Sequence, residues 1–253
     1  MAERMKEAMV FAAGLGTRLR PLTDDLPKAL VPVGGKPMLE HVILRLKKAG
    51  FTHIVVNVHH FGQKIIDFLE EKKNFGVTVD ISDERDALLD TGGGIRKAAG
   101  YFRKGNPVLI HNVDILSDVD LAGLYESHSE SQAAASLWVS RRTTSRYLLF
   151  DGQNRLCGWE NRKTGEVKSP FPGFCPARYE AYAFGGIHVI SPALLERMQE
   201  WDEKFSIIDF YLSVAGDAEI RACPASGGAF WMDLGKPEAL AEAENYLKAV
   251  EHE

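Results

Sequence analysis

Apolar residues in the first half of the chain gather into short runs that are separated by comparable intervals. These runs occupy residues 8–12, 54–58, 77–81 and 108–112. Short, nearly continuous apolar segments are typical of strands that are covered on both faces. The pattern therefore predicts a parallel sheet buried between two layers of helices.

Apolar positions between these runs recur at helical spacing. Pro37 pre-sets a first turn, apolar residues follow at helical intervals over 39–46, and Gly50 ends the segment. Further helical segments are expected at residues 63–71, after the glycines 92–94, and at residues 121–128. Alternating strands and helices imply right-handed crossovers and a Rossmann-like, doubly wound α/β fold.

The second half of the chain has a different pattern. The expected elements are a β-hairpin at 147–159, a loop at 169–176, a long strand at 182–190, a helix at 192–201, and a short strand at 230–233 before a C-terminal helix. No repeat or linker divides the sequence. We therefore predict a single domain, residues 1–253, with a mixed sheet and a small additional β layer.

The composition is that of an ordinary globular protein, with 45% hydrophobic and 26% charged residues. A net charge of −5 argues against a nucleic-acid-binding protein, and the densest basic group, Arg141, Arg142 and Arg146, is interpreted as a solvated face. No apolar run is long enough to span a bilayer, and residues 1–4 lead into no signal-like segment. We expect a cytoplasmic protein without a membrane partner, and the sequence indicates no oligomeric state.

Cysteine and histidine residues give no pattern of a metal site. Cys157, Cys175 and Cys223 are far apart and lack paired spacing, so we expect buried, inert thiols. His59 and His60 follow an expected strand, but neighbouring strand residues point to opposite faces and do not easily bind one ion. Packing or an ordinary hydrogen bond is the expected role of this pair.

Residues 12–23, with the sequence AAGLGTRLRPLT, are the most informative segment, and Pro27 and Lys28 follow them closely. Glycines after a strand let backbone N–H groups approach phosphate oxygens, and Arg18 and Lys28 add positive charge. The segment lacks the G-x-x-x-x-G-K-[ST] pattern of a P-loop. It does not match a dinucleotide-binding loop either, because Leu19 stands where that loop has its third glycine. A tight turn with surface cations remains the alternative at this point.

Two aspartates follow expected strands and are candidate metal ligands. Asp114 comes after residues 108–112, and Asp233 ends the short strand at 230–233. Mg²⁺ is normally held by one or two carboxylates together with substrate phosphates and water. For each aspartate alone, a helix cap or turn is the alternative role.

Several segments together resemble the sugar-1-phosphate nucleotidylyltransferase superfamily. The resemblance rests on G-x-G-T-R-L-x-P-L-T with the later P-K, and it continues at residues 31–38, 89–95, 112–114, 184–187 and 231–235. It implies a fold of the nucleotide-diphospho-sugar transferase type, with a nucleotide-binding part at about 1–130 and a sugar-binding part at about 131–253. The implied substrates are a nucleoside triphosphate and a sugar 1-phosphate, and the implied cofactor is Mg²⁺.

The resemblance also implies roles for individual residues. The catalytic residues are expected to be Arg18 and Lys28, and the metal ligands Asp114 and Asp233. The nucleotide is expected to contact Ala12, Gly14, Gly16, Gly92, Gly93 and Asn112. The sugar is expected to contact Glu160, Asn161 and Gly186.

The reaction is consistent with this set of residues. A sugar 1-phosphate is largely dianionic at neutral pH, because its second pKa is about 6. It therefore needs charge neutralisation and in-line positioning at the α-phosphorus rather than a general base. The presence of cations and carboxylates together argues against a non-catalytic nucleotide-binding regulator, which is the alternative of another class.

The sequence departs from the family pattern at several positions. Val113 replaces the usual glycine before Asp114, Ala29 replaces a proline, and residues 160–162 do not match the E-K-P of many hexose enzymes. The L-D-T-G-G-G-I segment most resembles the N-acetylmuramate 1-phosphate uridylyltransferases, which supply cell-envelope precursors. Mannose- and heptose-1-phosphate guanylyltransferases are the alternative. For the acidic sugar, a cation is expected from Arg146, Arg162 or Lys163.

Overall fold

A computed structural model describes residues 5–250. Residues 1–4, on which the expectation of no signal-like segment rests, lie outside the described part of the chain. Four parallel strands form the centre of the fold, in the order β6-β1-β4-β5. They are β1 (Lys6–Phe11), β4 (Phe51–Val58), β5 (Thr78–Asp83) and β6 (Val108–Asn112). The predicted Rossmann-like arrangement of the first half is confirmed.

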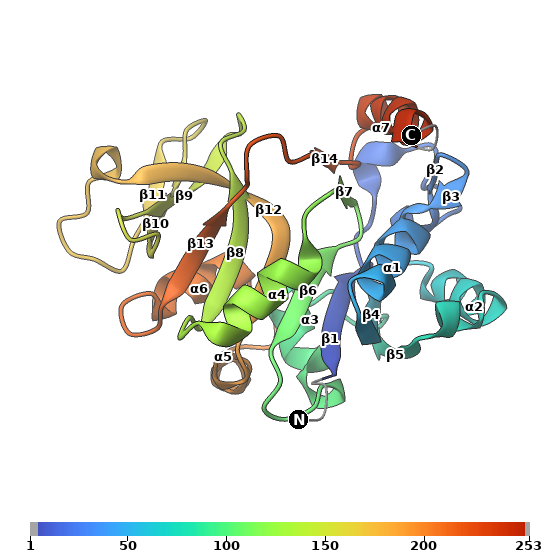
Figure 1. Ribbon diagram of the computed structural model, residues 1–253, viewed down its shortest axis with the longest axis horizontal. Helices are drawn as coiled ribbons and strands as arrows, with labels where there is room; N and C mark the ends of the chain where they lie inside the picture. The colour runs from blue at the N-terminus through green and yellow to red at the C-terminus, as the bar shows by residue number, and fades with distance from the viewer. Residues whose placement is uncertain (1–4, 251–253) are drawn as a thin grey trace.

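Helices cover both faces of this parallel sheet (Figure 1). One face packs on α1 (Met38–Lys48), α2 (Gly62–Glu71), α4 (Leu121–Glu130) and α7 (Pro237–Val250). The other face packs on α3 (Asp90–Ala98), α5 (Pro192–Arg197) and α6 (Ile207–Val214). Alternate residues of one strand serve the two cores: Ala8 and Val10 belong to the first and Met9 to the second. Burial on both faces explains the continuous apolar runs.

An antiparallel extension continues the sheet beyond β6. Strand β12 (Glu180–Ile190) lies between β6 and β8 (Ala135–Ser140), and β13 (Ile220–Pro224) pairs with β8 in parallel. The other end of β12 pairs with β9 (Arg146–Phe150), followed by β10 (Leu156–Asn161) and β11 (Glu166–Lys168). The resulting ten-stranded mixed sheet confirms the α/β fold class and the hairpin of β9 and β10.

Strand β12 changes partners at a glycine pair. Its register against β8 shifts between Phe184 and His188, and Gly186 has a positive φ of +73°. A Cβ on Gly185 would lie 2.1 Å from the Trp138 ring, and one on Gly186 would lie 2.7 Å from Asn112 Nδ2. The two glycines therefore let β12 bend closely over the end of β6.

Two short ribbons complete the fold. One joins β7 (Ile115–Ser117) to β14 (Trp231–Asp233), and the other joins β2 (Pro32–Val33) to β3 (Lys36–Pro37). Figure 1 shows the β7–β14 ribbon beside α7, beyond the end of β6. The ribbon carries a C-terminal segment to the carboxyl edge of the parallel strands.

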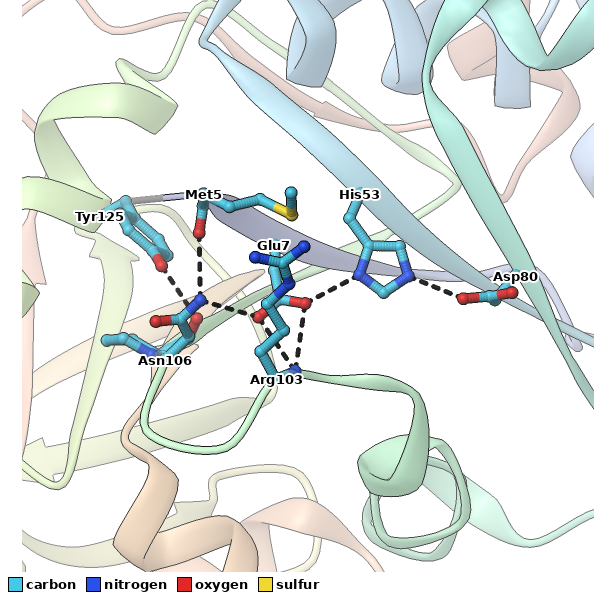
Figure 2. A network of polar contacts seen from close by, with 8 residues as sticks. Met5, Glu7, His53, Asp80, Arg103, Asn106 and Tyr125 are labelled. Atoms are coloured by element: carbon cyan, nitrogen blue, oxygen red, sulfur yellow. Dashed lines mark hydrogen bonds and ion pairs between the residues drawn. The ribbon is translucent and has the colours of Figure 1, made fainter. Parts of the chain in front are cut away.

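Buried polar groups at the opposite, amino-terminal edge bond one another (Figure 2). The Glu7 side chain is fully buried and accepts hydrogen bonds from the Arg103 backbone N–H and from Asn106 Nδ2. His53 bridges Glu7 and Asp80, with 2.8 Å from each ring nitrogen to a carboxylate oxygen. Several hydrogen bonds are needed to keep a buried carboxylate stable, so this network holds strand ends together.

Two expectations about composition are tested by the described residues. Between residues 5 and 250, no helix combines the length and the apolar character that a membrane crossing requires. The three cysteines are free, but only Cys157 is buried, whereas Cys223 is half-buried and Cys175 is exposed. The expectation of three buried thiols was wrong for Cys175, because it lies in the loop predicted at 169–176.

Candidate active site

The carboxyl ends of the parallel strands surround a cavity. Phe11, Asn57 and Asn112 are aligned across β1, β4 and β6 at this edge. The cavity has a volume of about 490 Å³. Its walls include Phe11, Ala13, Gly14, Lys28, Asn57, Glu84, Leu88, Asp90, Thr91, Asn112, Val113, Asp114 and Lys204. Open α/β sheets bind ligands at this edge, so the cavity is the candidate active site.

The glycine-rich loop leaves β1 at the cavity. Asn57 Oδ1 accepts hydrogen bonds from the backbone N–H groups of Ala12, at 2.7 Å, and Ala13, at 3.3 Å. Gly14 lines the cavity with open space where a Cβ would stand. Gly16 has φ +65°, and a Cβ on it would lie 2.9 Å from Thr23 Cγ2. The loop is thus fixed at Ala12 and Gly16, and its backbone faces the cavity at Gly14.

Asn57 and Glu84 form a buried pair that no sequence motif indicated. Both are 1% exposed, and Asn57 Nδ2 donates a hydrogen bond of 2.7 Å to Glu84 Oε1. Burial raises the pKa of Glu84 above its usual range, although the hydrogen bonds from Asn57 and Leu89 oppose this shift. The signal in the sequence was a single polar residue, Asn57, inside the apolar run at 54–58.

Lys28 and Asp114 meet in the cavity wall. The Lys28 ammonium and the Asp114 carboxylate form an ion pair, with side chains 10% and 15% exposed. Lys28 begins a 3-10 turn after Pro27, and Asp114 lies between β6 and β7. Two charges so poorly hydrated need each other or a charged ligand. The structure therefore brings together one predicted catalytic residue and one predicted metal ligand.

Asp233 and Arg18 lie beside this pair. The Leu234 N–H donates a 2.8 Å hydrogen bond to the Asp114 carbonyl oxygen, and Asp233 is aligned with Ile115 across the β7–β14 ribbon. A Cβ on Gly235 would lie 2.4 Å from Arg18 Nη2 and 2.7 Å from Asp233 Oδ1. Only glycine leaves room for these two side chains to approach each other. The four predicted residues thus come from distant segments to one edge.

The residues fit the Mg²⁺ that the resemblance implies. Asp114 precedes the ribbon residue opposite Asp233, so the two aspartates lie at the same end of the ribbon. Hard oxygen donors of this kind, completed by phosphates and water, are what Mg²⁺ prefers. Within residues 5–250 no group of three or more acidic, histidine or cysteine side chains is placed to hold a metal alone. Substrate phosphates would therefore have to complete the coordination.

The glycines of the D-T-G-G-G segment lie inside a helix rather than before it. Helix α3 begins at Asp90, and the N–H groups of Gly92 and Gly93 both donate to the Phe205 carbonyl oxygen, at 2.8 and 3.3 Å. Neither glycine lines the cavity, whereas Asp90 and Thr91 do. The expectation that the helix begins after these glycines was wrong, because α3 already includes them and the Phe205 carbonyl oxygen accepts from their amides. Contact between the nucleotide and Gly92 or Gly93 stays a prediction.

Gly92→Ala is expected to destabilise the protein by about 1–3 kcal/mol through overpacking. A Cβ on Gly92 would lie 2.2 Å from the Phe205 ring, so the segment before α6 would have to move. The matched control is Gly100→Ala, where no atom lies within 4 Å of the added Cβ. Urea unfolding of both variants measures the effect. A Gly92→Ala variant as stable as Gly100→Ala would contradict this packing role.

The predicted sugar-binding residues are placed in two different regions. Gly186 lies against Asn112 at the cavity edge. Glu160 and Asn161 end β10 in the extension and are absent from the cavity walls. There, Glu160 pairs with Arg162 at 2.6 Å, and Asn161 Oδ1 accepts from the Lys163 N–H. Contact between the sugar and these residues stays a prediction.

The contacts of His59 and of Val113 explain why these two residues stand where they do. His59 Nδ1 lies 2.6 Å from the Glu84 carbonyl oxygen, which confirms an ordinary hydrogen bond. Val113 is 4% exposed and belongs to the core on the α1 side, while its N–H donates to the Phe11 carbonyl oxygen. The larger residue in place of glycine is thus accommodated by the core.

A parallel sheet with a glycine loop, a buried Lys–Asp pair and a cavity at its carboxyl edge defines a nucleotide-binding α/β protein. The nucleotidyl transferase family model matches residues 7–153. The N-acetylmuramate alpha-1-phosphate uridylyltransferase of Caulobacter vibrioides is 34% identical over 98% of this chain and 99% of its own length. The chain therefore belongs to the nucleotidyl transferase family.

Two further comparisons extend this result. The mannose-1-phosphate guanylyltransferase of Mycobacterium tuberculosis is 25% identical over 94% of this chain and 63% of its own length. The UDP-glucose pyrophosphorylase of Acinetobacter baumanii has a similar fold, with a TM-score of 0.74 and 19% identity over 96% of this chain and 93% of that chain. The latter similarity concerns the fold alone.

Proposed function

We propose that this protein transfers a nucleoside monophosphate from a nucleoside triphosphate to a sugar 1-phosphate and releases pyrophosphate. The observation that carries the proposal is the Lys28–Asp114 pair in the wall of the cavity, beside the glycine-rich loop. Phosphate oxygens are stabilised by positive charge and by a backbone that they can approach closely, and this cavity is lined by Lys28 and Gly14.

The reaction balances without a general base. An oxygen of the sugar 1-phosphate forms a bond to the α-phosphorus, and the bond from that phosphorus to the bridging oxygen of pyrophosphate breaks. Lys28 neutralises charge around the α-phosphate, and Arg18 holds the departing pyrophosphate. The interactions of Lys28 and Arg18 with the phosphate oxygens are expected to strengthen as negative charge shifts toward the leaving group. Electrostatic catalysis acts through interactions of this kind.

Asp114 and Asp233 are proposed to hold Mg²⁺ together with the substrate phosphates. When bound, the ion would neutralise phosphate charge and fix the α-phosphate in line with the attacking oxygen. The protein's own contribution is to hold both carboxylates at the end of the β7–β14 ribbon. Lys28 neutralises Asp114 until the metal and substrate arrive.

For the substrates we propose UTP and N-acetylmuramate 1-phosphate. The relative named for these substrates covers the chain and is itself covered almost completely, whereas the guanylyltransferase relative is matched over 63% of its length. With these substrates, we propose that the protein supplies precursors of the cell envelope.

Competition kinetics test the choice of substrates. The purified enzyme is given UTP with N-acetylmuramate 1-phosphate, and separately GTP with mannose 1-phosphate. We expect kcat/KM to favour the first pair by at least about a hundredfold, because a mismatched base leaves buried polar groups unpaired. Equal or better turnover of GTP with mannose 1-phosphate would contradict the substrate assignment and leave the reaction class standing.

A further inference from the structure

Arg142 lies between the candidate active site and the antiparallel extension. It follows β8 and lines two cavities, of about 380 and 260 Å³. Its guanidinium carbon is 4.1 Å from the centre of the Trp231 ring, and Nη2 donates a 2.8 Å hydrogen bond to the Phe184 carbonyl oxygen. The expectation of a solvated basic face was therefore wrong for Arg142, which is half-buried.

The guanidinium of Arg142 uses only part of its hydrogen-bonding capacity. Its Nε is buried without a hydrogen-bond partner, and among residues 5–250 no carboxylate forms an ion pair with it. Burial lowers its pKa, against the opposing influence of Asp233 and Tyr147. A half-buried cation without an ion pair loses part of its hydration, and stacking on an indole ring offsets only part of that cost. An anionic ligand would supply what is missing.

The neighbouring arginines do not share this condition. Arg141 pairs with Glu180, and Arg162 pairs with Glu160 at 2.6 Å. Arg146 lines the smaller of the two cavities and is exposed to solvent. Arg142 is the cation of this group that combines burial with an unpaired guanidinium.

Arg142 lies on the side of the candidate active site where the sugar of the substrate is expected. Trp231 and Asp233 are two residues apart on β14, so they face the same side of that strand. Phe184, which accepts from Arg142, directly precedes the glycine pair that bends over Asn112. A sugar whose 1-phosphate lies at Asp114 and Asp233 would extend its ring toward the guanidinium.

We propose that Arg142 binds a carboxylate carried by the sugar ring of the substrate and so selects acidic over neutral sugar 1-phosphates. This inference rests on the proposed function and deepens it. N-acetylmuramate differs from N-acetylglucosamine by one lactyl ether, which carries a carboxylate. A planar guanidinium held against an indole ring is well suited to bind that group with directional hydrogen bonds.

The test compares two sugar 1-phosphates that share everything except the lactyl group. Arg142→Gln is expected to lower kcat/KM for N-acetylmuramate 1-phosphate by about 100-fold. For N-acetylglucosamine 1-phosphate, the same variant should stay within about threefold of the wild type. Arg142→Lys, which keeps the charge but loses the planar fork, should show a smaller loss that is again confined to the acidic sugar.

Arg141→Gln is the matched control, because Arg141 is adjacent, lines the larger cavity and is already paired. It should leave the ratio of kcat/KM between the two sugars unchanged. Circular dichroism and thermal unfolding verify that each variant is folded. If Arg142→Gln misfolds, Arg142→Lys decides the question by the same ratio.

Equal losses for both sugars would overturn the proposal, since they would indicate binding of the shared phosphate or a structural role. A selective loss in Arg146→Gln instead of the Arg142 variants would also overturn it. A wild-type enzyme that prefers the neutral sugar would refute this inference but leave the proposed reaction intact. Absence of turnover with every sugar 1-phosphate would instead refute the proposed function.

Discussion

Asp114→Asn is expected to lower kcat by more than about a hundredfold, equivalent to roughly 3 kcal/mol of lost transition-state stabilisation. The substitution removes a metal ligand and also the carboxylate that pairs with Lys28. Asp233→Asn should have a loss of similar size, although its side chain has no such partner among the described ion pairs. Steady-state kinetics at saturating Mg²⁺ measure both effects.

Asp67→Asn, on the exposed face of α2, is the matched control and should keep wild-type turnover. Because Asp114 is 15% exposed and paired, thermal unfolding must accompany the kinetics. Near-normal turnover in either Asp114→Asn or Asp233→Asn would contradict the metal assignment of that residue. Loss of turnover with loss of folding in Asp114→Asn alone would leave Asp233→Asn to decide.

Lys28→Ala is expected to depress kcat by roughly ten- to a hundredfold while raising KM much less, which is the signature of an interaction that strengthens in the transition state. The ammonium is held in the cavity wall by Asp114, so it is positioned before the substrate binds. Pre-positioned charge needs no reorganisation during the reaction.

The control for this variant is Lys104→Ala, an exposed lysine at the amino-terminal edge near Arg103 and Asn106. It should keep both kcat and KM. An effect of Lys28→Ala on KM alone would mean that Lys28 merely binds the ground-state triphosphate. The ion pair with Asp114 would then be structural.

The parallel half of the fold was predictable because its pattern is local. Residues 8–12 and 108–112 are buried on both faces of the sheet. Strands buried in this way consist of nearly continuous apolar residues, which can be recognised in the sequence. Strands β8 and β13 and helix α6 were not predicted. Strand β13 contains Arg221 and Pro224, and its pairing with β8 depends on residues far away in the chain.

The candidate site was predictable where sequence motifs mark its residues. Gly14, Lys28 and Asp114 line one cavity, and Asp233 reaches the same edge. Asn57 was missed because it is a single polar residue in an apolar run. Glu84 was missed because nothing in the charged segment 83–86 indicates that one of its residues is buried, and the two meet only because β4 and β5 pair.

Gly92 and Gly93 show a different limit of sequence reasoning. A glycine run serves a phosphate loop and a close packing contact equally well. In this structure the Phe205 carbonyl oxygen accepts hydrogen bonds from both amides, so the glycines form a packing contact. That partner comes from a distant segment with no sequence signal of its own.

Pyrophosphate release tests the central claim most directly. The purified wild-type protein is incubated with Mg²⁺, each of the four nucleoside triphosphates, and a panel of sugar 1-phosphates. We expect pyrophosphate to form only when both substrates are present, in equal amount with a nucleotide sugar, and to be strongly reduced by Asp233→Asn. Pyrophosphate formed without a sugar 1-phosphate, or no pyrophosphate with any pair of substrates, would contradict the account.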